Sequence, residues 1–364
     1  MDLGEAGPIN DSIALISRRM SAGQYAASDL SAGLDRLHDL VYAPLARHLT
    51  NTSHLIICPD GQLSRVPFEI LPVGKHFLVE EKTISYVTSG REIMRLAKPK
   101  THARVSKSVV MGNPDFDCDV AKPQHPVPGA QLAAAPSVLR SLTRHFDGLK
   151  FQPLPGAEAE ARSLAALLGN DALLYLGADA SVAKLKSAQF PRVLHLATHG
   201  FYLPDQEINL LRRQTTANGN DNWENPLVRC GLALAGANHS IQTTNAAVGN
   251  GLLTGLEASL LNLQGTELVI LSACDSGTGE LEIGEGVMSL RRAFLIAGAQ
   301  TVLASHWEIS DTATQQLMAE FMRRWQNGEP RATAWRDAQL SLLHSKDFSN
   351  PYFWAAFTLT GQWR

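Results

Sequence analysis

Short apolar runs alternate with amphipathic segments through the second half of the chain. The apolar runs have the length and continuity of buried strands: "RVLHLATHG", "ELVILSACDSG", "TVLASHW" and "FWAAFTLTG". Helical spacing of apolar residues marks "GAEAEARSLAALLG", "GEGVMSLRRAFLIAG", "DTATQQLMAEFMRRWQNG" and "ATAWRDAQLSLLHS". Strands that are apolar along their whole length and alternate with helices are typical of parallel sheets covered on both faces. The pattern therefore predicts an α/β fold, an αβα sandwich with a mainly parallel sheet.

The first 150 residues follow a different pattern. Helical spacing of apolar residues before "TNTSH" gives way to β-rich runs, "HLIIC", "FLVEEKTISYV" and "SVVMGNP". The later segment "AKPQHPVPGAQLAAAPS" carries four prolines and is typical of a linker. We therefore predict a helical N-terminal segment at residues 1–50, a first lobe at 51–150 and a second at 151–364, without internal repeats.

Composition and charge narrow the class of protein. The chain has 364 residues, of which 45% are hydrophobic and 18% charged, as in ordinary globular proteins. A net charge of −3 with scattered basic residues argues against nucleic acid as the ligand. The start "MDLGEAGPINDS" has no signal-peptide character, and no apolar stretch is long enough for a membrane span. We expect a cytoplasmic protein that binds neither nucleic acid nor membrane.

Two predicted strands end on side chains that can carry out chemistry. One ends with His199 and Gly200, and the other with Cys274 followed by Asp275. Ligands collect at the carboxyl ends of parallel strands, so neighbouring strands would bring this histidine and cysteine together. An imidazole can take the thiol proton, and backbone amides near Gly200 and Cys274 can stabilise an oxyanion. The alternative is that Cys274 is a small buried residue and His199 a hydrogen-bonded polar group.

Metal and cofactor signals are weak. His195 and His199 have the spacing of helical metal ligands, but their segment is strand-like and lacks a third ligand nearby. The glycine-rich "GTGELEIGEG" lacks the Lys-Ser/Thr of a phosphate loop. The four cysteines are far apart and form no CxxC pair. We therefore expect no metal and no cofactor, with His195 in the core or behind the site.

Several sequence blocks together resemble the CHAT domain, a bacterial family of caspase-like and separase-like cysteine peptidases. The blocks are "CPDGQLSRVPFEIL", "VLHLATHGFY", "LVILSACDSGTGE", "GEGVMSLRRAFLIAGAQTVLASHWEISD" and "NPYFWAAFTLTGQWR", in the order of the family. The resemblance implies that His199 is the base and Cys274 the nucleophile, with the amides of Gly200 and Cys274 as the oxyanion site. It also implies that a degenerate, pseudo-caspase-like lobe precedes the active one. Many family members begin with tetratricopeptide repeats, which this chain lacks, so a sensor is either absent or a separate protein.

We expect acidic residues near the predicted site to determine which substrate side chain is recognised. "HWEISD" resembles a separase segment that carries an acid for a basic P1 side chain, and Asp311 is the matching position. Asp311 also precedes "TATQQLMAEF" and is equally suited to a helix N-cap. Asp275 and Glu285 are the other candidate substrate-binding acids.

Three functions remain open from the sequence. The first is a regulated cysteine endopeptidase acting on a protein substrate. The resemblance places it in a bacterial stress, antiphage or cell-death pathway, with a separate activator and a gasdermin-like or toxin-like partner. The second is a catalytically silent binding or regulatory module with the same fold, because fold alone does not establish activity. The third retains the thiol chemistry but uses it in an amidase or transferase.

Overall fold

The computed structural model describes residues 3–26, 28–96, 105–119, 150–202, 226–242, 251–273, 283–307 and 311–364. Of residues 226, 242, 283–289 and 311, only the backbone is described.

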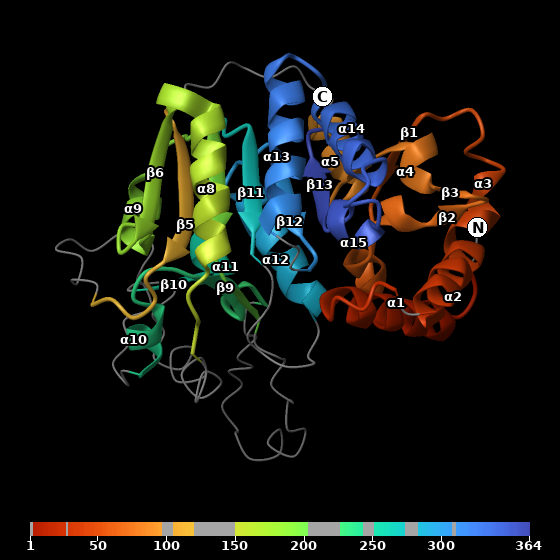
Figure 1. The fold of residues 1–364 in the computed structure, drawn as a ribbon, viewed down its shortest axis with the longest axis horizontal. Helices are drawn as coiled ribbons and strands as arrows, with labels where there is room; N and C mark the ends of the chain where they lie inside the picture. The colour runs from red at the N-terminus through yellow and green to blue at the C-terminus, as the bar shows by residue number, and fades with distance from the viewer. Residues whose placement is uncertain are drawn as a thin grey trace, which may run out of the picture.

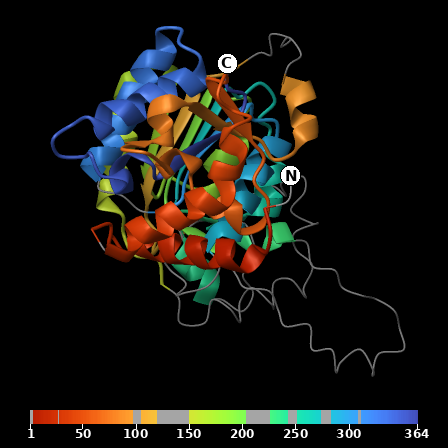
Figure 2. The same cartoon turned by 90° about the vertical axis from the view of Figure 1, so that its right-hand side faces the viewer.

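The N-terminal part begins with helices whose apolar residues recur at helical spacing. Ile9, Ile13, Ile16 and Met20 are buried along one face of the first helix, which packs on the second. Figure 2 shows these two helices in front of the lower part of the sheet. The elements are α1 (Ala6–Ser21), α2 (Ser28–Leu37), the π-helical η1 (His38–Tyr42) and α3 (Ala43–Ala46).

Short strands and turns follow up to residue 114. They are β1 (His54–Ile57), η2 (Gly61–Arg65), η3 (Phe68–Ile70), β2 (Pro72–Val73), β3 (His76–Phe77), α4 (Leu78–Glu81), β4 (Thr83–Tyr86), α5 (Gly90–Leu96) and β5 (Ser108–Pro114). The run "FLVEEKTISYV", predicted as β-rich, contains a helical turn at Leu78–Glu81. This turn forms because Glu80 accepts a hydrogen bond from the backbone of Phe77 and caps the start of α4.

Strands and helices alternate through the remainder of the chain. The strands are β6 (Ala172–Gly177), β7 (Val193–Ala197), β8 (Gly200–Tyr202), β9 (Cys230–Ala233), β10 (Leu252–Thr254), β11 (Leu268–Ser272), β12 (Thr301–Ser305) and β13 (Phe357–Gly361). The helices are α8 (Pro155–Leu168), α9 (Val182–Ser187), α10 (Ala237–Gln242), α11 (Gly255–Ser259), α12 (Ile283–Ile296), α13 (Asp311–Gln326), α14 (Arg331–Leu343) and α15 (Pro351–Trp354), with 3-10 turns η4 (Gly169–Asp171) and η6 (Pro226–Val228).

A single eight-stranded sheet forms the centre of the molecule. Its strand order is β1-β4-β13-β12-β11-β7-β5-β6, and every neighbouring pair is parallel except β12 with β13. This confirms the predicted α/β fold with a mainly parallel sheet. Because β1, β4 and β5 belong to this same sheet, the structure does not show a separate pseudo-caspase-like lobe before it. The division near residue 150 stays a prediction, since residues 120–149 lie outside the described ranges.

The central strands are apolar throughout because both sheet faces are covered. On β7, Val193 packs in one core cluster and Leu194 in the other. On β11, Leu268 likewise belongs to the first cluster and Val269 to the second. Adjacent strand residues point to opposite faces, so an unbroken apolar run buries both.

Helices form a layer on each face of the sheet. Figure 1 shows α8 and α13 side by side across one face, where α13 also packs against α14. Helices α11 and α12 pack together, and α12 lies on β12. No helix in the described part of the chain has both the length and the apolar character required to cross a bilayer.

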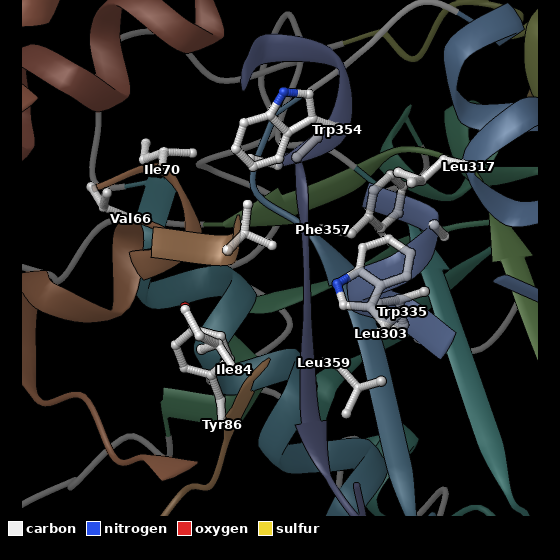
Figure 3. Close-up of a cluster of buried hydrophobic side chains, with 14 of the residues drawn as sticks. Val66, Ile70, Ile84, Tyr86, Leu303, Leu317, Trp335, Trp354, Phe357 and Leu359 are labelled. Carbon is white, nitrogen blue, oxygen red and sulfur yellow. The ribbon is translucent and has the colours of Figure 1, made fainter. Parts of the chain in front are cut away.

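Aromatic side chains fill the core between β13 and α14. Figure 3 shows Trp335, Trp354 and Phe357 around β13, together with aliphatic residues from β12 and α13. Trp335 and Phe357 meet edge to face with ring centroids 6.3 Å apart, and all three are at most 1% exposed. The C-terminal strand is thereby anchored between the N-terminal strand β4 and the central strands.

A small antiparallel sheet lies at the carboxyl end of β7. Its strand order is β10-β9-β8, and β8 begins only three residues after β7 ends. Gly200 of β8 pairs with Leu232 of β9. This small sheet therefore fixes the chain just beyond the end of β7, where the predicted site residues His199 and Gly200 are located.

Candidate active site

The candidate site is positioned by the paired ends of β7 and β11. These strands are parallel neighbours, with Ala197 opposite Ser272 in the last residue pair of the ladder. Beyond this pair, the Thr198 amide donates to the carbonyl of Ser272 at 3.2 Å. The prediction that the two strands are adjacent and parallel is confirmed.

His199 lies in an aromatic pocket directly after β7. His199 is 8% exposed, and its ring centroid lies 5.3 Å from that of Phe116 and 5.7 Å from that of Phe151. Its Nε2 is 2.8 Å from the carbonyl oxygen of Gln152, which can only accept. Nε2 therefore carries a proton, and in the neutral imidazole Nδ1 is the nitrogen with the basic lone pair.

Asn238 fixes the chain segment that orients His199. Its side chain accepts from the amide of Phe151 at 2.9 Å and donates to the carbonyl of Phe151 at 3.0 Å. It also donates to Asp117 at 3.0 Å, and it is 2% exposed. Asn238 thus holds the residue that precedes Gln152. Asn238 was not predicted from the sequence, because no local pattern around "AGANHS" indicates a long-range contact.

Gly200 lies against the end of β11. A Cβ atom built on Gly200 would be 3.6 Å from the carbonyl oxygen of Ala273, the residue before Cys274 in the sequence. That separation is ordinary van der Waals contact, so no described neighbour requires glycine here.

A buried polar network links the two strands to α8. Nε2 of His195 is 2.8 Å from Oε1 of Glu160, and Oε2 of Glu160 accepts from the hydroxyl of Ser272 at 2.9 Å. His195 is 0% exposed and Glu160 is 6% exposed. This agrees with the expectation that His195 lies in the core. Glu160 was missed because it occurs among the alanines of an amphipathic helix and resembles a solvent-facing charge.

Other candidate residues fall wholly or partly outside the described set. Cys274 and Asp275 lie outside the described residues, and no side chain is described for Glu285 or Asp311. The backbone of Glu285 belongs to α12, and Asp311 is the first residue of α13.

Two described thiols have environments that oppose ionisation. Burial and the nearby charge of Asp60 raise the pKa of the partly exposed Cys58 thiol. Burial and Asp115 similarly raise the pKa of Cys118. Since the thiolate is the nucleophile, neither environment favours nucleophilic reactivity at neutral pH.

His306 belongs to a second buried cluster. Its Nε2 accepts from Arg291 at 2.9 Å and lies 3.0 Å from the hydroxyl of Thr358. Burial, followed by the charge of Arg291, holds the pKa of His306 well below its usual value. Trp307 is in the core, where its Nε1 donates to the carbonyl of Tyr352 at 2.9 Å.

Glu69 and Tyr86 extend this cluster into the N-terminal part. The Tyr86 hydroxyl donates to Glu69 at 2.6 Å. Burial raises the pKa of Glu69 to about 7, although the hydrogen bond from Tyr86 and the charge of Arg291 oppose this. Burial also lowers the pKa of Arg291 to about 10. The cluster thus joins η3 and β4 to α12 and β12.

No metal site is evident among the side chains that the structure describes. Within those ranges, no group of three or more His, Cys, Asp or Glu residues is placed to hold an ion. The donor set around His199 instead combines an imidazole, a backbone carbonyl and aromatic rings.

A family model described as the CHAT domain matches residues 32–362. The chain belongs to the CHAT domain family. The resemblance drawn from the sequence blocks is confirmed. The CHAT match includes β1, β4 and β5 as well as the later strands, in agreement with one continuous sheet.

The relatives of this CHAT domain include much longer proteins. Tetratricopeptide repeat protein 28 of Mus musculus is 26% identical over 378 aligned residues, covering 98% of this chain and 14% of the relative. The Homo sapiens protein of the same name is 27% identical over 377 residues, covering 97% and 14%. The chain therefore spans 14% of the length of these two relatives.

Two solved structures show distant similarity to this CHAT domain. The Saccharomyces cerevisiae separase–securin complex aligns with a TM-score of 0.43 and 13% identity, over 90% of this chain and 17% of that chain. The Arg-specific cysteine proteinase gingipain R aligns with a TM-score of 0.47 and 8% identity, over 98% and 74%. Both TM-scores are below 0.5, so neither similarity supports an assignment of activity.

Proposed function

We propose that this CHAT domain is a cysteine endopeptidase that cleaves a protein substrate through Cys274 and His199. The observation that carries the proposal is the register of β7 and β11. Each paired residue of β11 is 75 positions after its partner in β7, as in Ile270 and His195, and Cys274 is 75 positions after His199. Continuation of that register would place the thiol beside the imidazole.

The tautomer of His199 supports its role as the base. The hydrogen bond to Gln152 uses Nε2 as the donor, which leaves the lone pair on Nδ1. A base in this tautomer can remove the thiol proton of Cys274. The aromatic rings of Phe116 and Phe151 pack together against one side of the imidazole and restrict its rotation.

The proposed reaction has two steps. Sγ of Cys274 attacks the scissile carbonyl, His199 takes the thiol proton, and the backbone amides of Gly200 and Cys274 stabilise the oxyanion. The C–N bond breaks as His199 returns the proton to the leaving amine, which leaves a thioester on Cys274. His199 then removes a proton from water, whose oxygen attacks the thioester and releases the carboxylic acid and the thiol.

A thiol-reactive peptide probe tests the dyad. We expect the probe to label Cys274 in the wild-type protein and to lose this labelling in His199→Ala. The matched controls are Cys58→Ala and Cys118→Ala, which should label like the wild type. Cleavage of a diverse peptide library, analysed by mass spectrometry, should likewise disappear in Cys274→Ala. Labelling of Cys274 that is independent of His199, together with no cleavage, would indicate a silent module with an accessible thiol.

The acids Asp311, Asp275 and Glu285 are proposed to recognise a basic P1 side chain. Neutralising the responsible acid, for example in Asp311→Asn, should reduce cleavage after Lys or Arg far more than cleavage after apolar residues. Equal losses for both substrate types would remove that acid from the specificity site.

A further inference from the structure

A cavity of about 590 Å³ lies between α5 and the C-terminal end of α12. Its lining includes Arg91, Glu92 and Arg95 of α5, Gln264, and Arg292 and Ile296 of α12. We call this cavity the arginine pocket. Figure 2 shows α5, in orange at the right, at the margin of the molecule.

The arginine pocket is separate from the candidate active site. Gln264 precedes the amino end of β11, whereas the candidate site lies at the carboxyl end of that strand. Arg292 and Ile296 belong to the last two turns of α12, whose 14 residues span roughly 20 Å. A ligand in this pocket therefore need not contact His199.

Positive charge dominates the arginine pocket. Glu92 is the one acid in its lining, and both carboxylate oxygens are already used. Oε2 accepts from the amide and hydroxyl of Thr88 at 2.9 and 3.0 Å, and Oε1 accepts from Arg95 at 2.7 Å. Neither Arg91 nor Arg292 has an ion pair within the ranges that the structure describes. A chain with a net charge of −3 thus gathers two uncompensated guanidinium groups at one cavity.

Exposed apolar side chains accompany these arginines. Ile296 lines the pocket and is 55% exposed. Met94, on the same short helix as Arg91 and Arg95, is 76% exposed. Guanidinium groups bind carboxylates and phosphates. An exposed apolar side chain beside them contributes to binding only if the ligand covers it with apolar surface of its own. This combination favours an acidic peptide over a small inorganic anion.

We propose that the arginine pocket binds an acidic peptide segment of a partner protein. A carboxylate of the peptide pairs with Arg91 and Arg292, and a neighbouring apolar side chain of the peptide covers Ile296. The proposal does not depend on peptidase activity.

Peptide selection on the full chain tests this docking site. All proteins carry Cys274→Ser so that bound peptides are not cleaved, and random 12-residue peptides are selected by display. We expect the selected peptides to be enriched in Asp or Glu beside apolar residues. Fluorescence anisotropy should show that Arg91→Gln/Arg292→Gln weakens their binding about ten-fold or more, and that Ile296→Ser weakens it by a smaller factor. Arg36→Gln, an exposed arginine on α2, is the matched control and should bind as the parent does.

Several results would overturn the proposal. Selected peptides without acidic enrichment would contradict it, as would equal binding to the double variant with an unchanged thermal transition. Polyphosphate or a short oligonucleotide that binds through Arg91 and Arg292 when no peptide does would assign the site to phosphate ligands instead. If the double variant has an altered thermal transition, Arg91→Gln and Arg292→Gln are measured as single variants. Each single variant is then expected to bind the selected peptides more weakly than the parent.

Discussion

At the scale of single residues, the structure separates the requirements of the fold from those of the proposed chemistry. Gly200 and Gly231 illustrate this separation. A Cβ on Gly231 would lie within 2.3 Å of the carbonyl oxygen of Leu253, so packing requires glycine there. Among the described residues, a Cβ on Gly200 would meet nothing closer than 3.6 Å.

Gly200→Ala is therefore expected to fold and to lose activity. We expect its free energy of unfolding to change by less than about 1 kcal/mol, because the new methyl group fits. Peptide cleavage should fall about 10- to 100-fold, because the methyl group displaces a substrate carbonyl from the oxyanion site. Urea unfolding and kcat/KM provide the two measurements, with Gly231→Ala as the variant that loses stability. Full activity in Gly200→Ala would argue against an oxyanion role.

Asn238 is expected to act through the orientation of His199. Asn238→Ala removes the two hydrogen bonds to Phe151, whose neighbour Gln152 holds Nε2 of the imidazole. We expect kcat to fall about ten-fold or more with little change in KM, because the base is misplaced and the substrate pocket is not. Asn262→Ala is the control, since Asn262 bonds only to the exposed Gln189 among described side chains. A matching loss in both variants would contradict the proposed role.

At the scale of elements, α8 is held to the sheet by buried hydrogen bonds as well as by apolar packing. Its face buries Ala161 and Leu164, as amphipathic spacing requires, but also Glu160. Glu160 bridges β7 and β11 through His195 and Ser272. Removing a buried carboxylate that accepts two hydrogen bonds lowers the free energy of unfolding, because the two donors are left buried without an acceptor.

Glu160→Gln is expected to destabilise the protein by about 1–3 kcal/mol. The amide group of glutamine donates hydrogen bonds, so it cannot accept from both His195 and Ser272. Glu158→Gln, two residues earlier on the same helix and more exposed, should have a clearly smaller effect. Urea unfolding of the two variants at neutral pH makes the comparison. Equal stability of the two variants would show that the buried bridge contributes no more than the exposed ion pair.

At the scale of the whole molecule, the sheet unites segments far apart in the sequence. β5 lies between β6 and β7, and β13 lies between β4 and β12. The N-terminal part therefore supplies strands near both edges of one sheet. The Glu69, Tyr86, Arg291 and His306 cluster crosses the same boundary.

A chain shortened to residues 151–364 is expected not to fold alone. Removal of β5 leaves facing edges of β6 and β7 unpaired, and removal of β4 exposes an edge of β13. Near-UV circular dichroism and thermal scans should show no cooperative transition, in contrast to the full chain. A sharp transition in the shortened chain would support an independent domain beginning near residue 151.

The pH dependence of stability tests the buried Glu69. Its pKa is about 7 in the folded chain, against an ordinary value of 4.5. Between these pH values the unfolded chain loses the proton first, so this residue lowers the free energy of unfolding as pH rises from about 4.5 to about 7. Glu69→Gln has no ionisable group at this position, so its free energy of unfolding does not fall in this way. Over that pH range it should rise relative to that of the wild type by up to about 3 kcal/mol.

Urea unfolding of both proteins at pH 5 and pH 8 measures the effect of Glu69. His306, whose pKa is depressed, costs stability below about pH 6.5 in both proteins, so its contribution largely cancels in the difference. A difference between the two proteins that does not change with pH would show that Glu69 is ionised in the folded chain throughout.

The sequence by itself determined strands β7, β11, β12 and β13 and helices α8, α12, α13 and α14, because doubly buried strands and amphipathic helices are local patterns. It also indicated His199, Gly200 and the end of β11, since reactive groups at strand ends follow from the parallel arrangement. It could not give the position of β5 within the sheet or the turn at Leu78–Glu81.

Only the tertiary structure decided which polar groups support the site. Asn238 and Glu160 contact residues that are 87 and 35 positions away, and no local pattern encodes such contacts. The arginine pocket likewise combines α5 with α12, which are almost 200 positions apart in the sequence. Strands and helices follow from interactions between neighbouring residues, whereas sites follow from the topology that brings distant segments together.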